Sequence, residues 1–489
     1  MGARGHREPA PGAQRADSRG ASGMTDPIRR LRDAEPVPFW LDDPARPDAA
    51  SALVADTRCD LLVVGGGYSG LWTALLAKER DSACDVLLIE AEEVGWAASG
   101  RNGGFCEASL THGLGNGHQR WPGELTVLER LGARNLQAIE DTVKRYGIAC
   151  DWERTGSLSV ATEPYQVDGL RELAALAARY GVERTLLETP EAVRAEIDSP
   201  AFLAGLWDRD GVAMVNPARL AWGLKRACEE RGVRIHEHTR ATRLTPSGGG
   251  VEVRTSYGRV RAGRVALATN AFPSLVRRHR PYTVPVYDYA LMTEPLSGRQ
   301  LSSVGWRHRQ GFADSANRFH YVRLTADNRI LWGGYDAVYH YRGRVRAEHD
   351  QRPETFATLA RHFARAFPQL DDLSFTHAWG GAIDTCTRFT AFFDLSHGGR
   401  VAYAAGFTGL GVGATRFAAE VMLDLLAGER TERTALEMVR HKPLPFPPEP
   451  IRSAAIGITK WSLAQADAND GRRNGWLRLL DRLGLGFDS

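Results

Sequence analysis

Residues 59–90 read CDLLVVGGGYSGLWTALLAKERDSACDVLLIE, and this stretch predicts how the first part of the chain folds. The apolar run Leu61–Val64 leads directly into a glycine-rich turn, which is followed by a segment of helical length. A second apolar run, Val86–Ile89, then ends at Glu90. A strand, a glycine-rich turn, a helix and a second strand in this order are typical of the βαβ unit that binds dinucleotides.

The glycines of the turn have the spacing Gly65-x-Gly67-x-x-Gly70. Gly65 permits the tight turn, Gly67 lets backbone amides approach a pyrophosphate, and Gly70 lets the helix pack closely against the strand. The positive end of the helix dipole then faces the phosphates. Glu90, about 20 positions further on, can accept hydrogen bonds from ribose hydroxyls and would repel a 2′-phosphate. The unit therefore predicts a site for FAD or NAD.

Two further segments favour FAD. Residues 95–104 read GWAASGRNGG, whose small side chains let a large planar ligand approach the backbone, and Arg101 is suited to meet a phosphate. Residues 400–413 read RVAYAAGFTGLGVG, which predicts a buried strand and a glycine-rich turn before a helix at 414–427. The amino end of that helix suits the negative charge of a reduced flavin. Besides Gly65, Gly67, Gly70 and Glu90, we expect cofactor contacts at Tyr68, Ser69, Ser99, Gly100, Arg101, Asn102, Gly103, Gly104, Ala241, Thr269, Gly406, Thr408, Gly409, Leu410 and Gly411.

This ordered set of motifs resembles the FAD-dependent D-amino acid oxidase (DAO) superfamily. The resemblance also rests on Val215-Asn216-Pro217, Ala268-Thr269-Asn270-Ala271 and Trp379-Gly380-Gly381, and it covers roughly residues 55–430. The run SGRNGG at 99–104 is most similar to the γ-glutamylputrescine oxidase and glycine oxidase branch. The resemblance implies an α/β fold, with a Rossmann-like FAD-binding domain interleaved with an α+β substrate domain that contains a mostly antiparallel sheet.

The interleaving predicts boundaries along the chain. We expect residues 55–112, 205–275 and 375–430 to form the FAD-binding domain, and residues 113–204 and 276–374 to form the substrate domain. Residues 1–40 lack apolar periodicity and are expected to be disordered, with translation from Met1 and from Met24 both open. Residues 431–489 predict a proline-rich linker followed by a helical tail.

The resemblance also indicates the substrate class. Relatives that oxidise amino acids carry an arginine, which clamps the substrate carboxylate, a few residues after the tryptophan that matches Trp379. In this sequence the matching position is Ala382 or Ile383, and neither side chain can bind a carboxylate. An amine without an α-carboxylate is therefore expected. Arg388 would restore the carboxylate interpretation if the alignment shifts, and a structural role for it stays open.

Four more residues are candidates on the substrate side. His112 titrates close to neutral pH and is suited to take a proton from an ammonium group, although a packing role is equally open. Tyr321 and Arg323 lie in a segment similar to the family strand above the flavin, with ordinary sheet packing as the alternative. Trp379 either forms a wall of the site or fills the core.

The cofactor is expected to be bound without a covalent link. Some sarcosine-oxidising relatives attach FAD through a cysteine in the neighbourhood of Cys386. Counting back from Phe393-Asp394 places Ala382, not Cys386, at the attachment point. Non-covalent FAD is therefore predicted, with Cys386 as a small buried residue.

The flavin chemistry implied is removal of a hydride from a carbon that bears nitrogen, giving an imine that water hydrolyses. We expect an FAD-dependent amine oxidase or dehydrogenase that acts on a primary or secondary amine, polyamine derivatives included. The electron acceptor is molecular oxygen or another molecule. A flavin-dependent amino-acid oxidase of the glycine, sarcosine or D-amino acid type remains an alternative. A flavin monooxygenase and a flavin subunit of a partner-dependent dehydrogenase remain alternatives too.

Composition limits the other partners. The net charge of +3 is small and dispersed, so no nucleic acid is expected. The six cysteines have no metal-ligand or CxxC spacing, which predicts no metal site and reduced thiols in the cytoplasm. No apolar run has the length of a membrane span and no signal peptide is evident, so no membrane is expected. The oligomeric state, a homo-oligomer included, stays open.

Overall fold

The computed structural model describes residues 27–486, and its first sheet is the one that the glycine-rich unit builds. Within the described residues this sheet has eight strands: β1 (Thr57–Val64), β2 (Val86–Ile89), β8 (Arg234–His236), β9 (Ala241–Ser247), β10 (Gly250–Thr255), β11 (Arg259–Leu267), β18 (Phe392–Ser396) and β19 (Val401–Ala405). Its main order is β18-β19-β11-β1-β2-β8, and the strands from β19 to β8 are parallel. The antiparallel strands β9 and β10 extend from β11, and β18 forms an antiparallel edge.

Both faces of this sheet are buried. Along β1, Leu61 and Val63 pack in the core that includes the helices α1 (Tyr68–Arg80), α3 (Leu125–Arg145), α6 (Pro217–Glu230) and α9 (Gly411–Ala427). Leu62 and Val64 alternate onto the opposite face and pack with apolar residues of β9, β10, β11 and β19. Coverage on both sides explains why the central strands read as continuous apolar runs.

The second sheet has nine strands within the described residues and is mostly antiparallel. They are β4 (Ser157–Ala161), β5 (Thr185–Leu187), β6 (Ala204–Asp208), β12 (Val284–Thr293), β13 (Gly311–Asp314), β14 (His320–Leu324), β15 (Ile330–Gly334), β16 (Val338–Tyr339) and β17 (Phe375–Thr385). The order is β16-β12-β15-β14-β13-β4-β6-β5, with β17 paired to β12. Helix α8 (Pro353–Ala366) covers one face, where Leu359 and Phe363 enter the second core.

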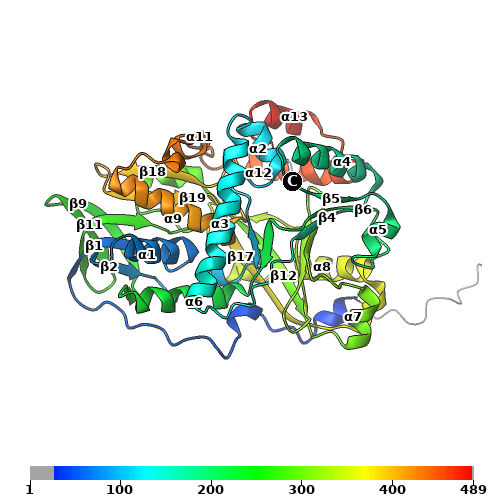
Figure 1. Ribbon diagram of the computed structural model, residues 1–489, viewed down its shortest axis with the longest axis horizontal. Helices are drawn as coiled ribbons and strands as arrows, with labels where there is room; N and C mark the ends of the chain where they lie inside the picture. Colours follow the sequence, from blue (N-terminus) through cyan, green and yellow to red (C-terminus); the bar gives the residue numbers. More distant parts are fainter. Residues whose placement is uncertain (1–26, 487–489) are drawn as a thin grey trace, which may run out of the picture.

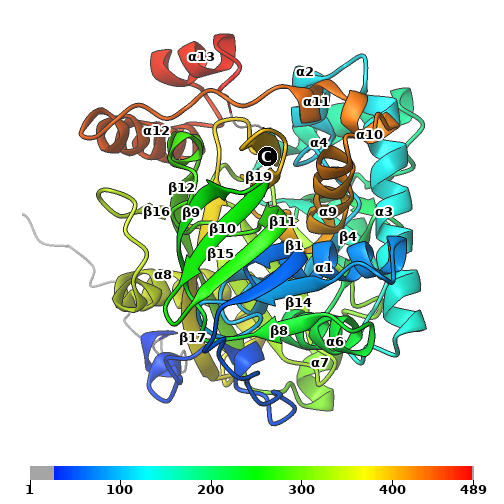
Figure 2. The ribbon, with the colours of Figure 1, turned by 90° about the vertical axis from the view of Figure 1, so that its left-hand side faces the viewer.

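Figure 1 shows the two sheets side by side, the first in the left half and the second in the right half, with α3 crossing in front between them. Figure 2 shows the first sheet from its own side, with α9 and α3 packed along one flank. The remaining elements are α2 (Leu114–Arg120), α4 (Pro164–Arg179), α5 (Pro190–Arg194), α7 (Gly298–Val304), α10 (Glu432–Ala435), α11 (Glu437–Arg440), α12 (Ile451–Asp467), α13 (Gly475–Arg482) and the strand pair β3 (Phe105–Glu107) and β7 (Val212–Met214). The expected α/β architecture with a second, mostly antiparallel sheet is confirmed.

The boundaries between the two parts differ from those expected. Strands β6 and β17 begin segments that we assigned to the FAD-binding domain, but both pair with strands of the second sheet. Helix α3 lies in a segment assigned to the substrate domain, and its apolar face instead packs in the core of the first sheet. The reason is that pairing partners far along the chain, rather than local pattern, determine to which sheet a segment belongs.

The two ends of the chain were predicted with different success. Residues 1–26 and 487–489 lie outside the described residues. Residues 27–40, expected to be disordered, contain two 3-10 helices, η1 (Pro27–Leu31) and η2 (Phe39–Leu41). Trp40 is buried there and its Nε1 donates to the carbonyl of Asn102, so this aromatic residue anchors the segment. At the other end, Lys460 of α12 pairs with Asp336, which fastens the helical tail beside the second sheet.

Candidate active site

A large cavity lies between the two sheets and the helical tail. Its volume is about 1670 Å³, which exceeds the roughly 300–1,000 Å³ of an ordinary small-molecule pocket. Most of the expected cofactor residues line it: Gly65, Gly67, Tyr68, Ser69, Glu90, Ser99, Arg101, Asn102, Gly103, Ala241, Thr269, Thr408, Gly409, Leu410 and Gly411. Segments far apart in sequence therefore meet at one cavity that is large enough for an extended ligand and a second small molecule.

The glycine-rich turn has the geometry that its sequence predicts. Gly65 has a φ of +117°, and a Cβ added there would lie 2.4 Å from the carbonyl oxygen of Ala268. A Cβ on Gly70 would lie 1.9 Å from the carbonyl oxygen of Gly65, so only glycine lets helix α1 approach the strand. Gly67 caps α1 with extended backbone, and its missing side chain leaves backbone open to the cavity.

Glu90 organises the other side of this turn. Its Oε2 accepts from the backbone N–H of Gly66 at 2.5 Å, while its Oε1 accepts from Glu92 N at 3.0 Å and from Trp96 Nε1 at 3.1 Å. An ionised carboxylate offers about four acceptor positions, so one remains after these three donors are counted. Glu90 thus holds the turn and still faces the cavity.

The loop at 98–104 is fixed by its own polar side chains. Ser99 Oγ accepts from Tyr68 N at 3.0 Å, and Asn102 Oδ1 accepts from Gly104 N at 2.8 Å. Arg101 lines the cavity with part of its guanidinium already bound to the protein, so its contact with a phosphate stays a prediction. Its Nη1 pairs with Asp350 at 2.5 Å and its Nε donates to the carbonyl of Trp96 at 2.8 Å. The guanidinium therefore joins this loop to the second sheet.

Four expected cofactor residues lie behind the cavity wall instead of on it. At each of these glycines an added Cβ would clash with a close neighbour: Gly70 with Gly65, Gly100 with Gly95, Gly104 with Val215 and Gly406 with Cys386. At Gly104 the φ is +78° and an added Cβ would lie 2.2 Å from the carbonyl oxygen of Val215. They shape the cavity by packing rather than by contacting its contents.

The glycine-rich turn before α9 wraps around a buried carboxylate that the sequence analysis missed. Asp384, at the end of β17, accepts from the backbone N–H of Gly406 at 2.6 Å. Burial raises its pKa to about 7, although backbone N–H groups of Gly406, Phe407 and Thr408 oppose the shift. The Thr408 hydroxyl accepts from Cys386 N at 3.3 Å, which fastens the turn to the neighbouring segment. The amino end of α9 consequently points at the cavity.

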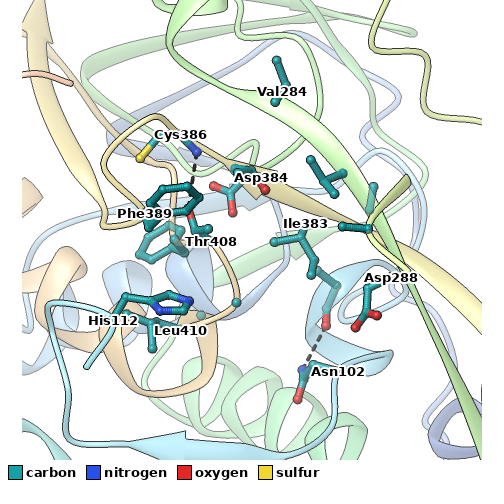
Figure 3. A pocket seen from close by; sticks show the side chains of 18 of the residues that line it. Asn102, His112, Val284, Asp288, Ile383, Asp384, Cys386, Phe389, Thr408 and Leu410 are labelled. Carbon is teal, nitrogen blue, oxygen red and sulfur yellow. Dashed lines mark hydrogen bonds between the residues drawn. The ribbon is translucent and has the colours of Figure 1, made fainter. Parts of the chain in front are cut away.

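Three of the five catalytic candidates line the cavity: His112, Tyr321 and Trp379. Figure 3 draws His112 beside Leu410 and Phe389, across the pocket from Ile383 and Asp288. Burial lowers the pKa of His112 below its usual range, so the imidazole is neutral at neutral pH. The Tyr321 hydroxyl donates to Asp288 Oδ2 at 2.7 Å, and Trp379 Nε1 donates to the carbonyl of Arg101 at 2.9 Å.

The other two candidates, Arg323 and Arg388, are buried away from the cavity lining. Arg323 donates to the carbonyls of Val215 at 2.6 Å and Gly104 at 3.3 Å. Arg388 donates to the carbonyls of His441 at 2.6 Å and Met438 at 2.8 Å. Burial lowers the pKa of both guanidinium groups to about 10. Because every one of these partners is a backbone carbonyl, the geometry favours the structural role that the sequence left open for Arg388, and the same role for Arg323.

Comparison with known proteins agrees with this geometry. The family model described as "DAO: FAD dependent oxidoreductase" matches residues 60–425, which is most of the chain. The chain belongs to the DAO family of FAD-dependent oxidoreductases. Gamma-glutamylputrescine oxidoreductase of Escherichia coli K12 is 32% identical over 397 residues, covering 79% of this chain and 88% of that protein. The probable oxidoreductase OrdL of Haemophilus influenzae is 26% identical over 384 residues, covering 76% and 84%.

Solved structures show the same fold. Glycine oxidase from Geobacillus kaustophilus superposes with a TM-score of 0.63 at 20% identity, covering 78% of this chain and 99% of that chain. The L-proline dehydrogenase from P. horikoshii has a TM-score of 0.64 at 18% identity, covering 77% and 95%. The family match ends at residue 425, so α12 and α13, which also contribute to the cavity lining, lie outside it.

The residues present at the cavity fit the FAD of this DAO-family enzyme. The backbone at Gly67 is open where a Cβ would occupy the cavity, and α1 and α9 both present their amino ends. The hydroxyl of Ser69 is buried at the cavity and has no hydrogen-bond partner within residues 27–486. Buried polar groups are normally satisfied, so this hydroxyl indicates a polar ligand.

Proposed function

We propose that this FAD-dependent enzyme oxidises the carbon–nitrogen bond of a primary or secondary amine that carries no α-carboxylate clamped at the flavin. One observation carries the proposal: Ala382 and Ile383, at the positions where the resemblance implies a carboxylate-binding arginine, both line the cavity and are apolar. A substrate carboxylate placed there would be desolvated without a partner, which is costly.

The cations of the cavity support the same reading. Within residues 27–486, each arginine or lysine that lines the cavity already contacts an acidic side chain or a carbonyl of the protein: Arg101 with Asp350, Arg240 with Glu92, Arg318 with Asp467, Lys460 with Asp336, Arg473 with Asp481 and Arg452 with the carbonyl of Pro447. A carboxylate entering the cavity would therefore have to share a cation with one of these partners. A neutral amine or an ammonium group would not.

In the proposed arrangement Glu90 and the Gly65–Gly70 turn hold the adenosine and pyrophosphate, while the loop 98–104 and the amino end of α9 surround the flavin ring. When bound, the flavin accepts a hydride from the carbon next to the substrate nitrogen. The chain orients the amine and excludes water, and the neutral imidazole of His112 is able to take a proton from an ammonium group before oxidation. The imine that leaves is hydrolysed by water.

The FAD is proposed to be non-covalent and the enzyme cytoplasmic. The Cys386 thiol is buried between the carbonyls of Thr390 and Gly406, and burial raises its pKa, so it is a poor nucleophile. All six cysteines are free, as is usual for proteins of the reducing cytoplasm. Within residues 27–486 no helix combines the length and the hydropathy needed to cross a bilayer. Acid precipitation that leaves a yellow supernatant tests the non-covalent link.

Anaerobic titration of the purified holoenzyme tests the activity. The visible flavin absorbance is followed after adding putrescine, γ-glutamylputrescine, sarcosine, glycine, D-alanine, NADH or NADPH separately. Bleaching by amines that lack an α-carboxylate is the expected result. Bleaching by the amino acids alone would refute the argument from Ala382 and Ile383, and bleaching by a nicotinamide alone would assign a reductase or monooxygenase. Reoxidation of the bleached enzyme by air then tests molecular oxygen as the electron acceptor.

A further inference from the structure

We infer that Asp288 is the binding site for an ammonium group of the substrate, and that this ammonium is a second nitrogen and not the one that is oxidised. The inference rests on the proposed amine oxidation and names the substrate class as an aliphatic diamine or polyamine. Its evidence is the position of Asp288 in the cavity wall and the lack of an ion-pair partner for it within residues 27–486.

The alternation of strand β12 brings Asp288 to the cavity. Its neighbours Tyr287 and Tyr289 are buried in the second core, and their hydroxyls donate to the carbonyls of Arg346 and His349. Because successive side chains of a strand point to opposite faces, Asp288 points away from the second core, and it lines the cavity, which the two tyrosines also border. Asp288 is partly exposed although it lies deep in the protein, so its accessible surface faces the cavity.

Unlike Asp350 and Asp336, Asp288 has no ion-pair partner within the described residues, and unlike the unpaired Asp384 it is not enclosed by several backbone N–H groups. Oδ1 of Asp288 accepts from Tyr289 N at 2.8 Å, and Oδ2 accepts from the Tyr321 hydroxyl at 2.7 Å. Asp350 pairs with Arg101 and Asp336 pairs with Lys460, whereas no ion pair of Asp288 occurs in the part of the chain that the structure describes. Two neutral donors leave acceptor positions free on a carboxylate.

The charge of this group calls for a cationic ligand. Burial raises the pKa of Asp288 to about 6, opposed by the hydrogen bonds from the Tyr321 hydroxyl and the Tyr289 backbone, so the carboxylate is ionised at neutral pH. A buried charge is expensive unless it is paired. An ammonium group supplies both the opposite charge and hydrogen-bond donors for the free acceptor positions.

The surroundings keep the carboxylate open and give the ligand an aliphatic path. Across the strand pair, Asp288 lies opposite Gly381, which presents no side chain to it, and the stem of Arg101 lies 3.5 Å from where a Cβ of Gly381 would be. Two residues along the same face, Val286 lies opposite Ile383, and both line the cavity. An apolar wall next to the carboxylate of Asp288 suits an alkyl chain that ends in an ammonium group.

Tyr321 cannot turn away from Asp288. A Cβ on Gly103 would lie 2.8 Å from Tyr321 Cε2, and a Cβ on Gly333 would lie 2.4 Å from Tyr321 Cζ, so the ring is held between two glycines. The hydroxyl therefore stays on Asp288 and fixes the carboxylate in one orientation. The acceptor positions that remain face the cavity.

The nitrogen at Asp288 is distinct from the reacting nitrogen because an ion pair favours the protonated form of an amine. Removal of a hydride from the adjacent carbon needs the lone pair of an unprotonated nitrogen. A nitrogen held by Asp288 is stabilised as ammonium and is thereby protected from oxidation. A substrate that uses this site needs a second nitrogen that reaches the flavin unprotonated.

The experiment compares three substrates of equal chain length: 1,4-diaminobutane, 4-aminobutanol and n-butylamine. Anaerobic flavin reduction gives kcat and KM for the holoenzyme, for Asp288→Asn and for Asp288→Glu. The control Glu172→Gln neutralises an exposed carboxylate at the same cavity. Flavin absorbance and thermal unfolding establish that each variant is folded and loaded.

For the wild type we expect kcat/KM for the diamine to exceed that for the two monoamines by about 10- to 150-fold, from one charge-assisted contact. Asp288→Asn is expected to abolish this preference by raising KM for the diamine, while the monoamine values stay within about threefold. Asp288→Glu should restore part of the preference, and Glu172→Gln should keep all of it.

Two results would overturn the inference while leaving amine oxidation intact. In the first, the wild type oxidises the monoamines as efficiently as the diamine, a comparison that needs no variant to fold. In the second, Asp288→Asn slows the diamine and the monoamines by the same factor, which would mean that Asp288 acts on the reacting nitrogen. Failure of every amine, with bleaching by amino acids or nicotinamides, would instead overturn the proposed function and this inference with it.

Discussion

Replacing Gly67 with alanine is expected to remove FAD binding without destabilising the protein. Gly67 has a φ of −83° and a ψ of −179°, a backbone that alanine adopts without strain. An added Cβ would have one close neighbour, Ser99 Oγ at 3.0 Å, which is the tip of a small side chain. Glycine-to-alanine changes at compatible backbone stabilise by about 0.4–1 kcal/mol, so unfolding without FAD should change by less than about 1 kcal/mol.

The added methyl group is expected to weaken FAD binding. It would occupy the space through which the amides at the start of α1 approach the pyrophosphate. One lost hydrogen bond to a charged group costs about 1.5–3 kcal/mol, and overpacking costs about 1–3 kcal/mol more. Together these weaken the FAD dissociation constant by about 100- to 10,000-fold, at about 1.4 kcal/mol per factor of ten.

Gly65→Ala, two residues earlier, is the matched contrast. Its φ of +117° and the 2.4 Å approach to the carbonyl of Ala268 place the cost on folding itself. Left-handed strain of about 1–3 kcal/mol and crowding of similar size should lower the thermal midpoint by several degrees even without FAD. Gly169→Ala lies inside helix α4 at the same cavity, with no atom outside the helix backbone within 4 Å, so it should leave FAD binding unchanged and raise stability by up to about 1 kcal/mol.

The assays are fluorescence titration of the apoprotein with FAD and thermal unfolding followed by circular dichroism. The reasoning would be refuted if Gly67→Ala bound FAD within about threefold of the wild type, because the pyrophosphate would then lie elsewhere. It would also be refuted if Gly67→Ala were as unstable without FAD as Gly65→Ala. In that case backbone conformation would not separate the two positions.

Two further predictions concern buried groups outside the cavity. Arg388→Met should lower the free energy of unfolding by about 2–4 kcal/mol, because the carbonyls of His441 and Met438 lose their donor. In steady-state kinetics KM for the substrate should stay within about threefold of the wild type. A large change in KM without a loss of stability would restore the interpretation of Arg388 as a carboxylate clamp. His279 is fully buried, and burial lowers its pKa to about 4 despite Asp394 at 3.0 Å, so the unfolded chain takes up the proton first, near pH 6.5. The neutral imidazole of His279 therefore stabilises the fold fully above about pH 6.5, and this stabilisation is lost as the pH falls towards about 4. In His279→Gln the thermal midpoint should depend less steeply on pH between about pH 6.5 and 5. An unchanged slope would contradict this assignment.

The first sheet was predictable from sequence because its signals are local. Close packing at Gly65 and Gly70 explains the turn, and the predicted apolar runs Leu61–Val64 and Val86–Ile89 form the end of β1 and the whole of β2. Strand β11 shows no comparable local signal: it runs without a break from Arg259 to Leu267, although only Val265–Leu267 is a continuous apolar run. A strand that pairs with β10 on one stretch and with β19 on another shows no such continuity in its local pattern.

The functional arginines were harder to place, since residue type alone does not reveal the partner. Arg323 and Arg388 stand in motif-like segments, yet both donate to carbonyls inside the core. Arg101 stands in the loop that lines the cavity, yet it pairs with Asp350, which lies 249 residues away. An arginine can satisfy carbonyls, carboxylates or phosphates with the same donors, so only the folded neighbourhood distinguishes these roles.

Asp288 is the clearest example of a site residue that the sequence alone does not identify. A single carboxylate in the apolar strand VPVYDYALMT is unusual, but its significance depends on the face that it occupies. That face is set by the pairing of β12 with β17, two strands whose partners are about ninety residues apart, which puts Asp288 opposite Gly381. A shift of one residue in this register would turn Asp288 into the second core and turn Tyr287 and Tyr289 out of it. The second core prevents that shift, because it would have to bury the carboxylate and expose two large aromatic rings. The packing of the sheet thus fixes a charged group in the substrate cavity, and the specificity proposed for Asp288 follows from how that sheet is stabilised.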